Sequence, residues 1–330
     1  MATAEQLKAL LKSHADGDDD RFLSIAMQVA AHAARQGHAR LAQELKSLID
    51  EAKERQGAPT ARRGPGGLTP LAQPRGELAG LITAAYPETS LADMVLDDST
   101  KARLQRVLKE HRQLAKLQEH GMRPRSRLLL IGPPGSGKTM TASALAGEMR
   151  LPLFTIVLDG LITRYMGETA AKLRLVFDAI RSVRGVYLFD EFDAIGGRRE
   201  ATNDVGEIRR VLNSFLQFLE QDESNSLILA ATNHPELLDR ALFRRFDDVI
   251  SYDVPSGDLV VRALKSRLGS FATRRIDWRK LGEAARGLSY AELTRAANDA
   301  VKEAVLDDRS EITTAALLAA FAERKVTRQG

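Results

Sequence analysis

The first fifty residues carry apolar positions at helical spacing. They form three stripes: Leu7, Leu10 and Leu11; Phe22, Ile25, Ala26, Val29 and Ala33; and Leu41, Leu45, Leu48 and Ile49. Apolar residues that recur at i, i+3, i+4 and i+7 are typical of amphipathic helices. Asp18 to Asp20 suit a helix N-terminus, and Gly37 suits a break between two helices. Residues 1–56 are therefore predicted to form a small three-helix bundle or helical hairpin.

The stretch that follows has no such periodicity. GAPTARRGPGGLTPLAQPRG, residues 57–76, is rich in Gly, Pro and Ala and contains scattered Arg. This composition is typical of a flexible linker, because Gly and Pro interrupt helices and strands alike. We predict that residues 57–76 tether the N-terminal helices to the rest of the chain.

From about residue 77, short apolar runs alternate with helical patterns. The strand-like runs are RLLLI, LFTIVL, GVYLFD, SLILAATN and DVISYDV. Strands separated by helices predict a parallel sheet covered by helices on both faces. Residues 77–255 are thus expected to form an α/β domain with a doubly wound parallel sheet. Beyond Pro255 the pattern is helical, apart from a short piece near RIDW, so residues 256–330 are expected to form a C-terminal helical lid.

Composition narrows the possible chemistry. Apolar residues make up 44% and charged residues 28% of the chain, an ordinary globular balance. The absence of cysteine excludes disulfides, thiolate metal sites and cysteine nucleophiles. No apolar run approaches the roughly 18–20 residues of a membrane span, and the start lacks a secretory pattern, so the cytoplasm is the expected location. The net charge of +4 is spread over well-mixed charges, which indicates a solvated surface.

A glycine-rich loop follows the first predicted strand of the sheet. IGPPGSGKT fits G-x-x-x-x-G-K-[ST] between a strand and a helical run, the context that this motif requires. Its backbone N–H groups and the following helix N-terminus suit phosphate, Lys138 suits the β- and γ-phosphates, and the Thr139 hydroxyl suits Mg²⁺. The sequence therefore predicts an ATP and Mg²⁺ site. The predicted nucleotide-binding residues are Gly132, Pro133, Pro134, Gly135, Ser136, Gly137, Lys138, Thr139 and Met140.

Two later strands end in polar residues that suit hydrolysis. VYLFDE ends in Asp190, expected to hold Mg²⁺, and Glu191, expected to polarise the attacking water. LILAATN ends in Asn233, which could hydrogen-bond the γ-phosphate or the water. Taken alone, a strand-end carboxylate often caps a helix and a strand-end Asn often forms a turn. Their position after a phosphate-binding loop favours the catalytic interpretation.

The stretch LDRALFRRFD contains two adjacent arginines, Arg244 and Arg245. In isolation such a pair would be interpreted as a solvated basic turn. Here it lies beyond the strand that ends in Asn233, and nothing in the pattern folds it back onto the nucleotide of its own chain.

These four elements, in this order, resemble the AAA family of P-loop ATPases over roughly residues 90–326. GPPGSGKT is similar to the Walker A motif of that family, YLFDEFDAI to Walker B, AATNHPELLD to sensor 1 and ALFRRFD to the arginine-finger segment. GLSYAEL resembles the lid motif near the adenine, although Tyr290 stands where relatives usually have Gly. The adenine contacts would come from Met94 to Leu96, in a segment without the usual glycine.

The resemblance implies an oligomer. Arginine fingers of the family complete the site of a neighbouring subunit and can contribute roughly 10³–10⁵ in rate. A single-tiered homo-hexameric ring is therefore expected, in which Arg244 and Arg245 act on the neighbour. Adjacent arginines are closest to the katanin, spastin and ESCRT-disassembling branch. That branch often carries a small N-terminal three-helix domain, which residues 1–56 resemble in length without a specific motif.

The stretch ITRYMGETAAKLR places Tyr165-Met166-Gly167 after the second of the predicted strands. In translocating relatives an aromatic–hydrophobic–glycine triplet at this position faces a central channel. An aromatic ring offers sequence-tolerant contact and methionine an adaptable one. The alternative is that Tyr165 packs into the core of a monomer, which its polar neighbours disfavour. A second channel loop is expected within residues 196–208.

The leading hypothesis is an ATP-driven ring that unfolds, translocates or remodels protein substrates through its pore. Residues 1–56 would recruit substrate, an adaptor or a separate protease, since H-E-x-x-H occurs nowhere in the sequence. One alternative is an ATP-binding switch that gates a partner protein without translocation. Another is a nucleic-acid-dependent motor, although no nucleic-acid-binding signature supports it. Its phosphate contacts would be Arg62, Arg63, Arg123, Arg125 and Arg127.

Overall fold

The structure is a computed structural model, and it describes residues 76–161, 166–196, 205–269, 271 and 276–327, together with Gln43. The chain divides into two compact units, Met1–Leu71 and Ala72–Gly330. Apart from Gln43, the first unit lies outside the described residues. The predicted helices of residues 1–56 and nearly all of the predicted linker therefore stay predictions.

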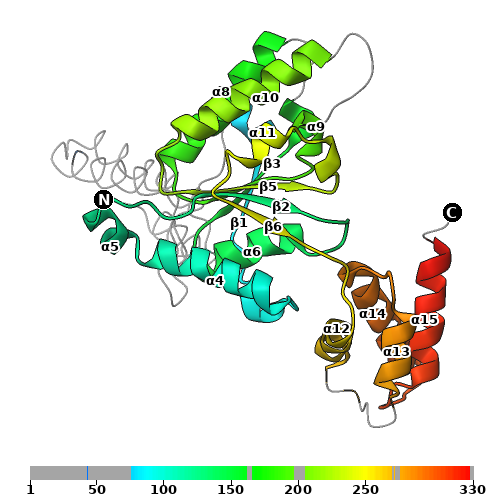
Figure 1. Ribbon diagram of the computed structural model, residues 1–330. Coiled ribbons are helices and arrows are strands. Elements are labelled where there is room, and N and C mark those ends of the chain that lie inside the picture. Colours follow the sequence, from blue (N-terminus) through cyan, green and yellow to red (C-terminus); the bar gives the residue numbers. More distant parts are fainter. Residues whose placement is uncertain are drawn as a thin grey trace, which may run out of the picture. The chain divides into compact units, whose positions relative to one another are not determined.

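A six-stranded sheet forms the centre of the second unit (Figure 1). Across the sheet the order is β1 (Ile82–Ala85), β3 (Leu153–Ile156), β4 (Val186–Phe189), β5 (Leu227–Thr232), β2 (Arg127–Ile131) and β6 (Asp248–Ser251). Strands β2 to β6 are mutually parallel, which confirms the expected doubly wound sheet. The edge strand β1 pairs antiparallel with β3 and was not predicted. Its four residues, ITAA, are too few and too weakly patterned to signal a strand.

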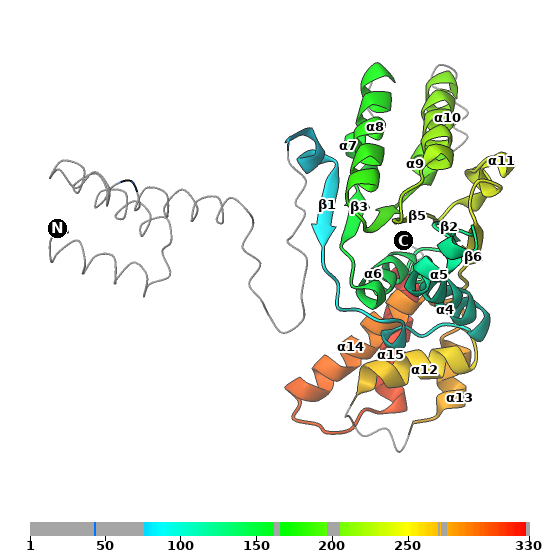
Figure 2. The same cartoon turned by 90° about the vertical axis from the view of Figure 1, so that its left-hand side faces the viewer.

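Helices cover both faces of the sheet. Strand β4 accounts for this arrangement, because its sequence VYLF is buried on both sides. Val186 and Leu188 pack with α4 and α6, whereas Tyr187 and Phe189 pack with α8 and α10 (Figures 1 and 2). The helical elements of this part are η1 (Gly76–Gly80), η2 (Leu91–Asp93), α4 (Asp98–Arg112), α5 (Leu114–Glu119), α6 (Lys138–Met149), α7 (Leu158–Leu161), α8 (Met166–Ser182), α9 (Asp193–Gly196), α10 (Val205–Gln221), η3 (Pro235–Leu237) and α11 (Arg240–Phe243).

The C-terminal part is helical, as expected. It consists of α12 (Asp258–Leu268), α13 (Trp278–Ala284), α14 (Tyr290–Leu306) and α15 (Thr314–Thr327), which share an aliphatic core of their own. Helix α14 begins with a capping box, in which the Glu292 N–H donates to Ser289 Oγ at 3.3 Å and the Ser289 N–H donates to Glu292 Oε2 at 2.6 Å. Within the ranges that the structure describes, no helix has both the length and the apolar character of a membrane span.

Candidate active site

The nine predicted nucleotide-binding residues form one continuous loop and helix start between β2 and α6. Gly132 has φ +149°, and a Cβ there would lie 2.3 Å from the carbonyl oxygen of Tyr252, so only glycine fits. Helix α6 begins after Gly137, which adopts a left-handed conformation and provides no side-chain cap. The first N–H groups of α6 are therefore available to an anion, and a phosphate is the natural ligand of such a helix start.

The lid approaches this loop closely. The Ala291 N–H donates to the carbonyl oxygen of Gly135 at 3.1 Å. A Cβ on Gly135 would lie 2.9 Å from the Ala291 Cβ and 2.9 Å from Ser289 Oγ. Glycine at this position thus lets the start of α14 rest directly on the phosphate-binding loop.

Lys138 connects the loop to the neighbouring strand. Its ammonium group donates to the carbonyl oxygens of Gly132 at 2.8 Å and Pro133 at 2.9 Å, and to Asn233 Oδ1 at 2.7 Å. The residue is buried, and burial lowers the pKa of its ammonium group, while nearby Asp190 and Asp193 act in the opposite direction. Two predicted site residues that are 95 positions apart in the sequence, Lys138 and Asn233, therefore meet directly.

Thr139 and Asp190 also meet, as a magnesium site requires. The Thr139 hydroxyl donates to Asp190 Oδ2 at 2.8 Å, and Asp190 Oδ1 accepts the Glu191 N–H at 3.0 Å. Glu191 is exposed and has φ +51°, an uncommon conformation for a residue with a side chain. Its backbone is held on the other side by Phe192, which is buried and whose N–H donates to the carbonyl oxygen of Ala231 at 2.8 Å. The Glu191 carboxylate is thus directed outward from a fixed backbone.

Three polar residues at this edge were missed by the sequence analysis. The Thr232 hydroxyl donates to Asp193 Oδ1 at 2.8 Å and accepts the His234 N–H at 3.0 Å, which ties the end of β5 to the turn after β4. Ser136 is buried inside the loop, and its Oγ has no hydrogen-bond partner in the described part of the chain. No short-range pattern identifies such residues, because their partners come from other strands or from a ligand.

These groups fit a nucleotide and Mg²⁺. The loop offers backbone N–H groups and the unpaired Ser136 hydroxyl, and Lys138 adds a positive charge. Thr139 and Asp190 offer hard oxygen ligands. Among the described residues no group of three or more His, Asp or Glu could hold a metal alone. Mg²⁺ usually binds through one or two carboxylates together with phosphates and waters, so this donor set is sufficient.

The predicted adenine side is a narrow cavity of about 60 Å³ between the segment around Met94, the phosphate-binding loop and the lid. Its lining includes Met140, Tyr290 and Ser136. Burial raises the pKa of the Tyr290 phenol, which is consistent with its place in this cavity. Typical small-molecule sites are several times larger, so a base would bind here only if Tyr290 or the lid moved.

The arginine pair lies at the opposite edge of the sheet. Arg244 and Arg245 precede β6, and its first residue, Asp248, pairs with Leu128 near the start of β2. The phosphate-binding loop begins only after the other end of β2. That strand spans five residues, roughly 16 Å at about 3.3 Å per residue, which exceeds the length of an arginine side chain. The fold therefore does not bring this pair to the nucleotide-binding residues of its own chain.

The predicted channel residues are only partly described. Tyr165 lies outside the described residues, and Met166 and Gly167 are the first residues of α8. The second channel segment, residues 196–208, includes the last residue of α9 and the first residues of α10, and residues 197–204 between them lie outside the described ranges.

Three candidate nucleic-acid contacts are engaged within the chain. Arg123 pairs with Glu223, and Arg125 pairs with Glu110 at 2.7 Å. Arg127 donates to the carbonyl oxygen of Asp222 at 3.0 Å. These arginines therefore contribute to the fold at the start of β2. Arg62 and Arg63 lie outside the described residues.

The fold and the site together define a P-loop ATPase. The family model described as "ATPase family associated with various cellular activities (AAA)" matches residues 128–254. An uncharacterized AAA family ATPase of Sinorhizobium fredii, y4kL, is 34% identical over 313 residues, which cover 94% of this chain and 92% of that protein. The chain therefore belongs to the AAA family, and it is an ATPase.

Other relatives match over a shorter part of their length. The ATP-dependent zinc metalloprotease FtsH 1 of Methylacidiphilum infernorum is 34% identical over 252 residues, 74% of this chain and 40% of that protein. The proteasome-activating nucleotidase of Pyrococcus abyssi is 33% identical over 224 residues, 64% of this chain and 57% of that protein. The chain thus spans about half the length of these two relatives.

Proposed function

We propose that this AAA ATPase forms a homo-hexameric ring that uses ATP hydrolysis to pull on or remodel protein substrates. The observation that carries this proposal is the separation of the arginine pair from the phosphate-binding loop by the length of β2. A chain built in this way has all parts of the site except the arginines at one edge. Its arginines can act only on the nucleotide of a second copy.

Each site residue then has a defined role. Lys138 and the loop N–H groups bind the phosphates, while Thr139 and Asp190 hold Mg²⁺, which neutralises phosphate charge when bound. Glu191 orients the attacking water and accepts its proton. Asn233 holds the γ-phosphate or the water, and its hydrogen bond to Lys138 supports this role.

The arginine segment supports action on the neighbour. In a ring whose subunits pack head to tail, the edge that carries Arg244 and Arg245 faces the phosphate-binding loop of the next copy. Positive charge supplied there stabilises the transition state of phosphoryl transfer. Adjacent arginines are the feature that this segment shares with the katanin and spastin branch. Kinship with that branch remains part of the proposal.

The names of the relatives favour protein as the substrate. One is named a zinc metalloprotease and another a proteasome-activating nucleotidase. This sequence contains no H-E-x-x-H, so we propose that any proteolysis involves a separate protease, recruited with an adaptor through residues 1–56. The substrate would contact Tyr165, Met166 and Gly167 in the central channel.

The test is threading of a fluorescent protein that carries an unstructured tail. Tyr165→Ala should leave basal ATP hydrolysis close to wild type and slow threading by roughly tenfold or more, because each lost aromatic contact is worth about 0.5–1.5 kcal/mol. Tyr165→Phe is the matched control and should thread normally. Undiminished threading by Tyr165→Ala would contradict the channel role. Glu191→Gln should bind the tagged protein and stall, whereas full function of that variant would indicate a switch.

A further inference from the structure

The turn that bears the arginine pair has a fixed backbone. Leu242 and Phe246, on either side of the pair, are both buried. The Arg245 N–H donates to the carbonyl oxygen of Leu242 at 3.0 Å. The ring of Phe246 lies edge-on to that of Phe192, with 6.5 Å between centroids. Phe192 directly follows Glu191, so the backbone of the arginine pair is anchored in the same core as the hydrolytic carboxylate.

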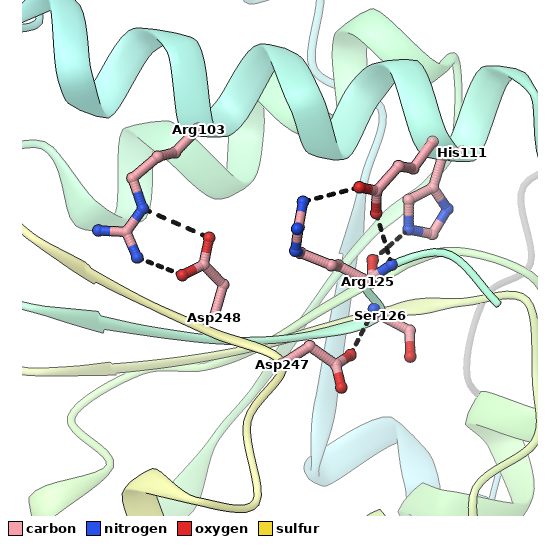
Figure 3. Close-up of polar contacts among 7 residues, drawn as sticks. Arg103, His111, Arg125, Ser126, Asp247 and Asp248 are labelled. Carbon is pink, nitrogen blue, oxygen red and sulfur yellow. Dashed lines mark hydrogen bonds and ion pairs between the residues drawn. The ribbon is translucent and has the colours of Figure 1, made fainter. Parts of the chain in front are cut away.

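The two residues after Phe246 are held as firmly. Asp247 Oδ2 accepts the N–H groups of Ser126 at 2.8 Å and Arg127 at 3.0 Å, at the start of β2. Asp248 forms an ion pair with Arg103 of α4 (Figure 3). In the same view, Glu110 and His111 of α4 hold Arg125, just before β2. The start of β6 is therefore tied both to β2 and to the helix that covers it.

The C-terminal end of α10 supplies the third support. Arg127 donates from Nη2 to the carbonyl oxygens of Asp222 at 3.0 Å and Glu220 at 3.5 Å, which caps the end of this helix. The Glu220 side chain forms an ion pair with Arg245. The N-terminal end of α10 belongs to the predicted second channel segment, so one helix connects that segment to the arginine pair.

The two adjacent arginines are consequently unequal. Arg245 is held by Glu220, with 47% of its side chain and 40% of the glutamate side chain exposed. Arg244 is exposed and forms no ion pair with another described residue. An ion pair this exposed contributes little to stability, because solvent screens it and two long side chains lose freedom. Its effect is mainly on the conformation of the arginine segment.

We infer that Glu220 is a positioning residue for the arginine pair. It holds Arg245, and the arginine that reaches the nucleotide of the neighbouring subunit is Arg244. This inference rests on the proposed function, because it assumes that the pair acts on a second copy. It adds a carboxylate that no sequence motif marks, and it gives the two arginines different tasks.

Single and double variants of the full-length chain test the division of tasks. Arg244→Ala should lower kcat for ATP by about 10³, the lower range of an arginine finger. Glu220→Gln and Arg245→Ala should each lower kcat about tenfold, less than the roughly 100-fold that a 1 Å misplacement can cost. The double variant should be no worse than either single one, because both remove one ion pair. KM for ATP should not change. Glu223→Gln, which breaks only the exposed pair with Arg123, is the matched control and should behave as wild type.

Mixed assemblies locate the defect. Lys138→Ala chains cannot use ATP but keep both arginines and Glu220. Adding them should raise hydrolysis per Glu220→Gln chain, because some of those chains then receive intact arginines from a neighbour. Arg244→Ala chains should be rescued in the same way.

Four results separate the possibilities. Rescue of Arg244→Ala without rescue of Glu220→Gln would place Glu220 in its own site or fold and overturn the inference. Wild-type activity of Glu220→Gln would overturn it as well. A loss in Arg245→Ala as large as in Arg244→Ala would mean that Arg245 itself contacts nucleotide, against the division of tasks. If neither variant were rescued, the neighbour-supplied arginine of the proposed function would fail instead.

Discussion

The two edges of the central sheet are organised in opposite ways. At the edge where the parallel strands end, polar side chains bond to one another: Lys138 to Asn233, and Thr139 to Asp190. At the edge where they begin, carboxylates hold arginines and backbone N–H groups, and Arg244 extends from this mount without a described ion pair. The first edge binds and hydrolyses, whereas the second presents a charge outward. The difference indicates that a complete site needs two chains.

This division follows from the topology of a parallel sheet. All strands from β2 to β6 place their carboxyl ends at one edge, so loops that are far apart in sequence converge there. The arginine pair precedes β6 instead of following a strand, and the sheet therefore separates it from that convergence. In such a fold, the side of a strand on which a motif lies decides whether it acts within its own chain or on a neighbour.

The largest effect expected at the hydrolytic edge is that of Glu191→Gln. Loss of the general base should lower kcat by about 10²–10⁴ while nucleotide binding persists. Mixing with Lys138→Ala chains should not restore activity, because the defect lies in the site that carries it. Steady-state hydrolysis and binding of a fluorescent nucleotide measure both properties. Glu236→Gln, an exposed carboxylate at the same edge, is the control. Rescue by mixing would contradict the proposed separation of the two edges.

A smaller effect is expected from Thr232→Val. This substitution keeps the shape of the side chain and removes its hydrogen bond to Asp193. One such bond is worth about 0.5–1.5 kcal/mol, so kcat should fall roughly two- to tenfold if the bond steadies the turn that bears Glu191. An unchanged kcat in a variant that folds normally would show that the Thr232–Asp193 bond serves stability alone. A melting curve distinguishes the two.

Much of the hydrolytic edge could be predicted from sequence, because its parts are local patterns. The phosphate-binding loop is one continuous motif between a strand and a helix, and Asp190, Glu191 and Asn233 directly follow runs of buried residues. The spacing of such runs reflects strand geometry, and parallel strands bring their ends together.

Other features could not be predicted, because they depend on contacts between distant segments. Glu220 belongs to an amphipathic helix and becomes notable only when its end meets Arg245. Thr232 looks like an ordinary strand residue until Asp193 is beside it. Strand β1 is too short to have a pattern, and pairing with β3 stabilises it. The roles of the site residues remain proposals until variants are measured.

The most direct test of the central claim, that each site is completed by a second chain, is hydrolysis per chain as a function of total protein concentration. Molecular mass is followed in parallel by sedimentation, at saturating ATP. The account predicts that the rate per chain rises as single chains convert to rings. It also predicts that Arg244→Ala abolishes this rise while the mass still increases. A rate per chain that stays constant while the mass changes would contradict the account, since a single chain would then hold a complete site.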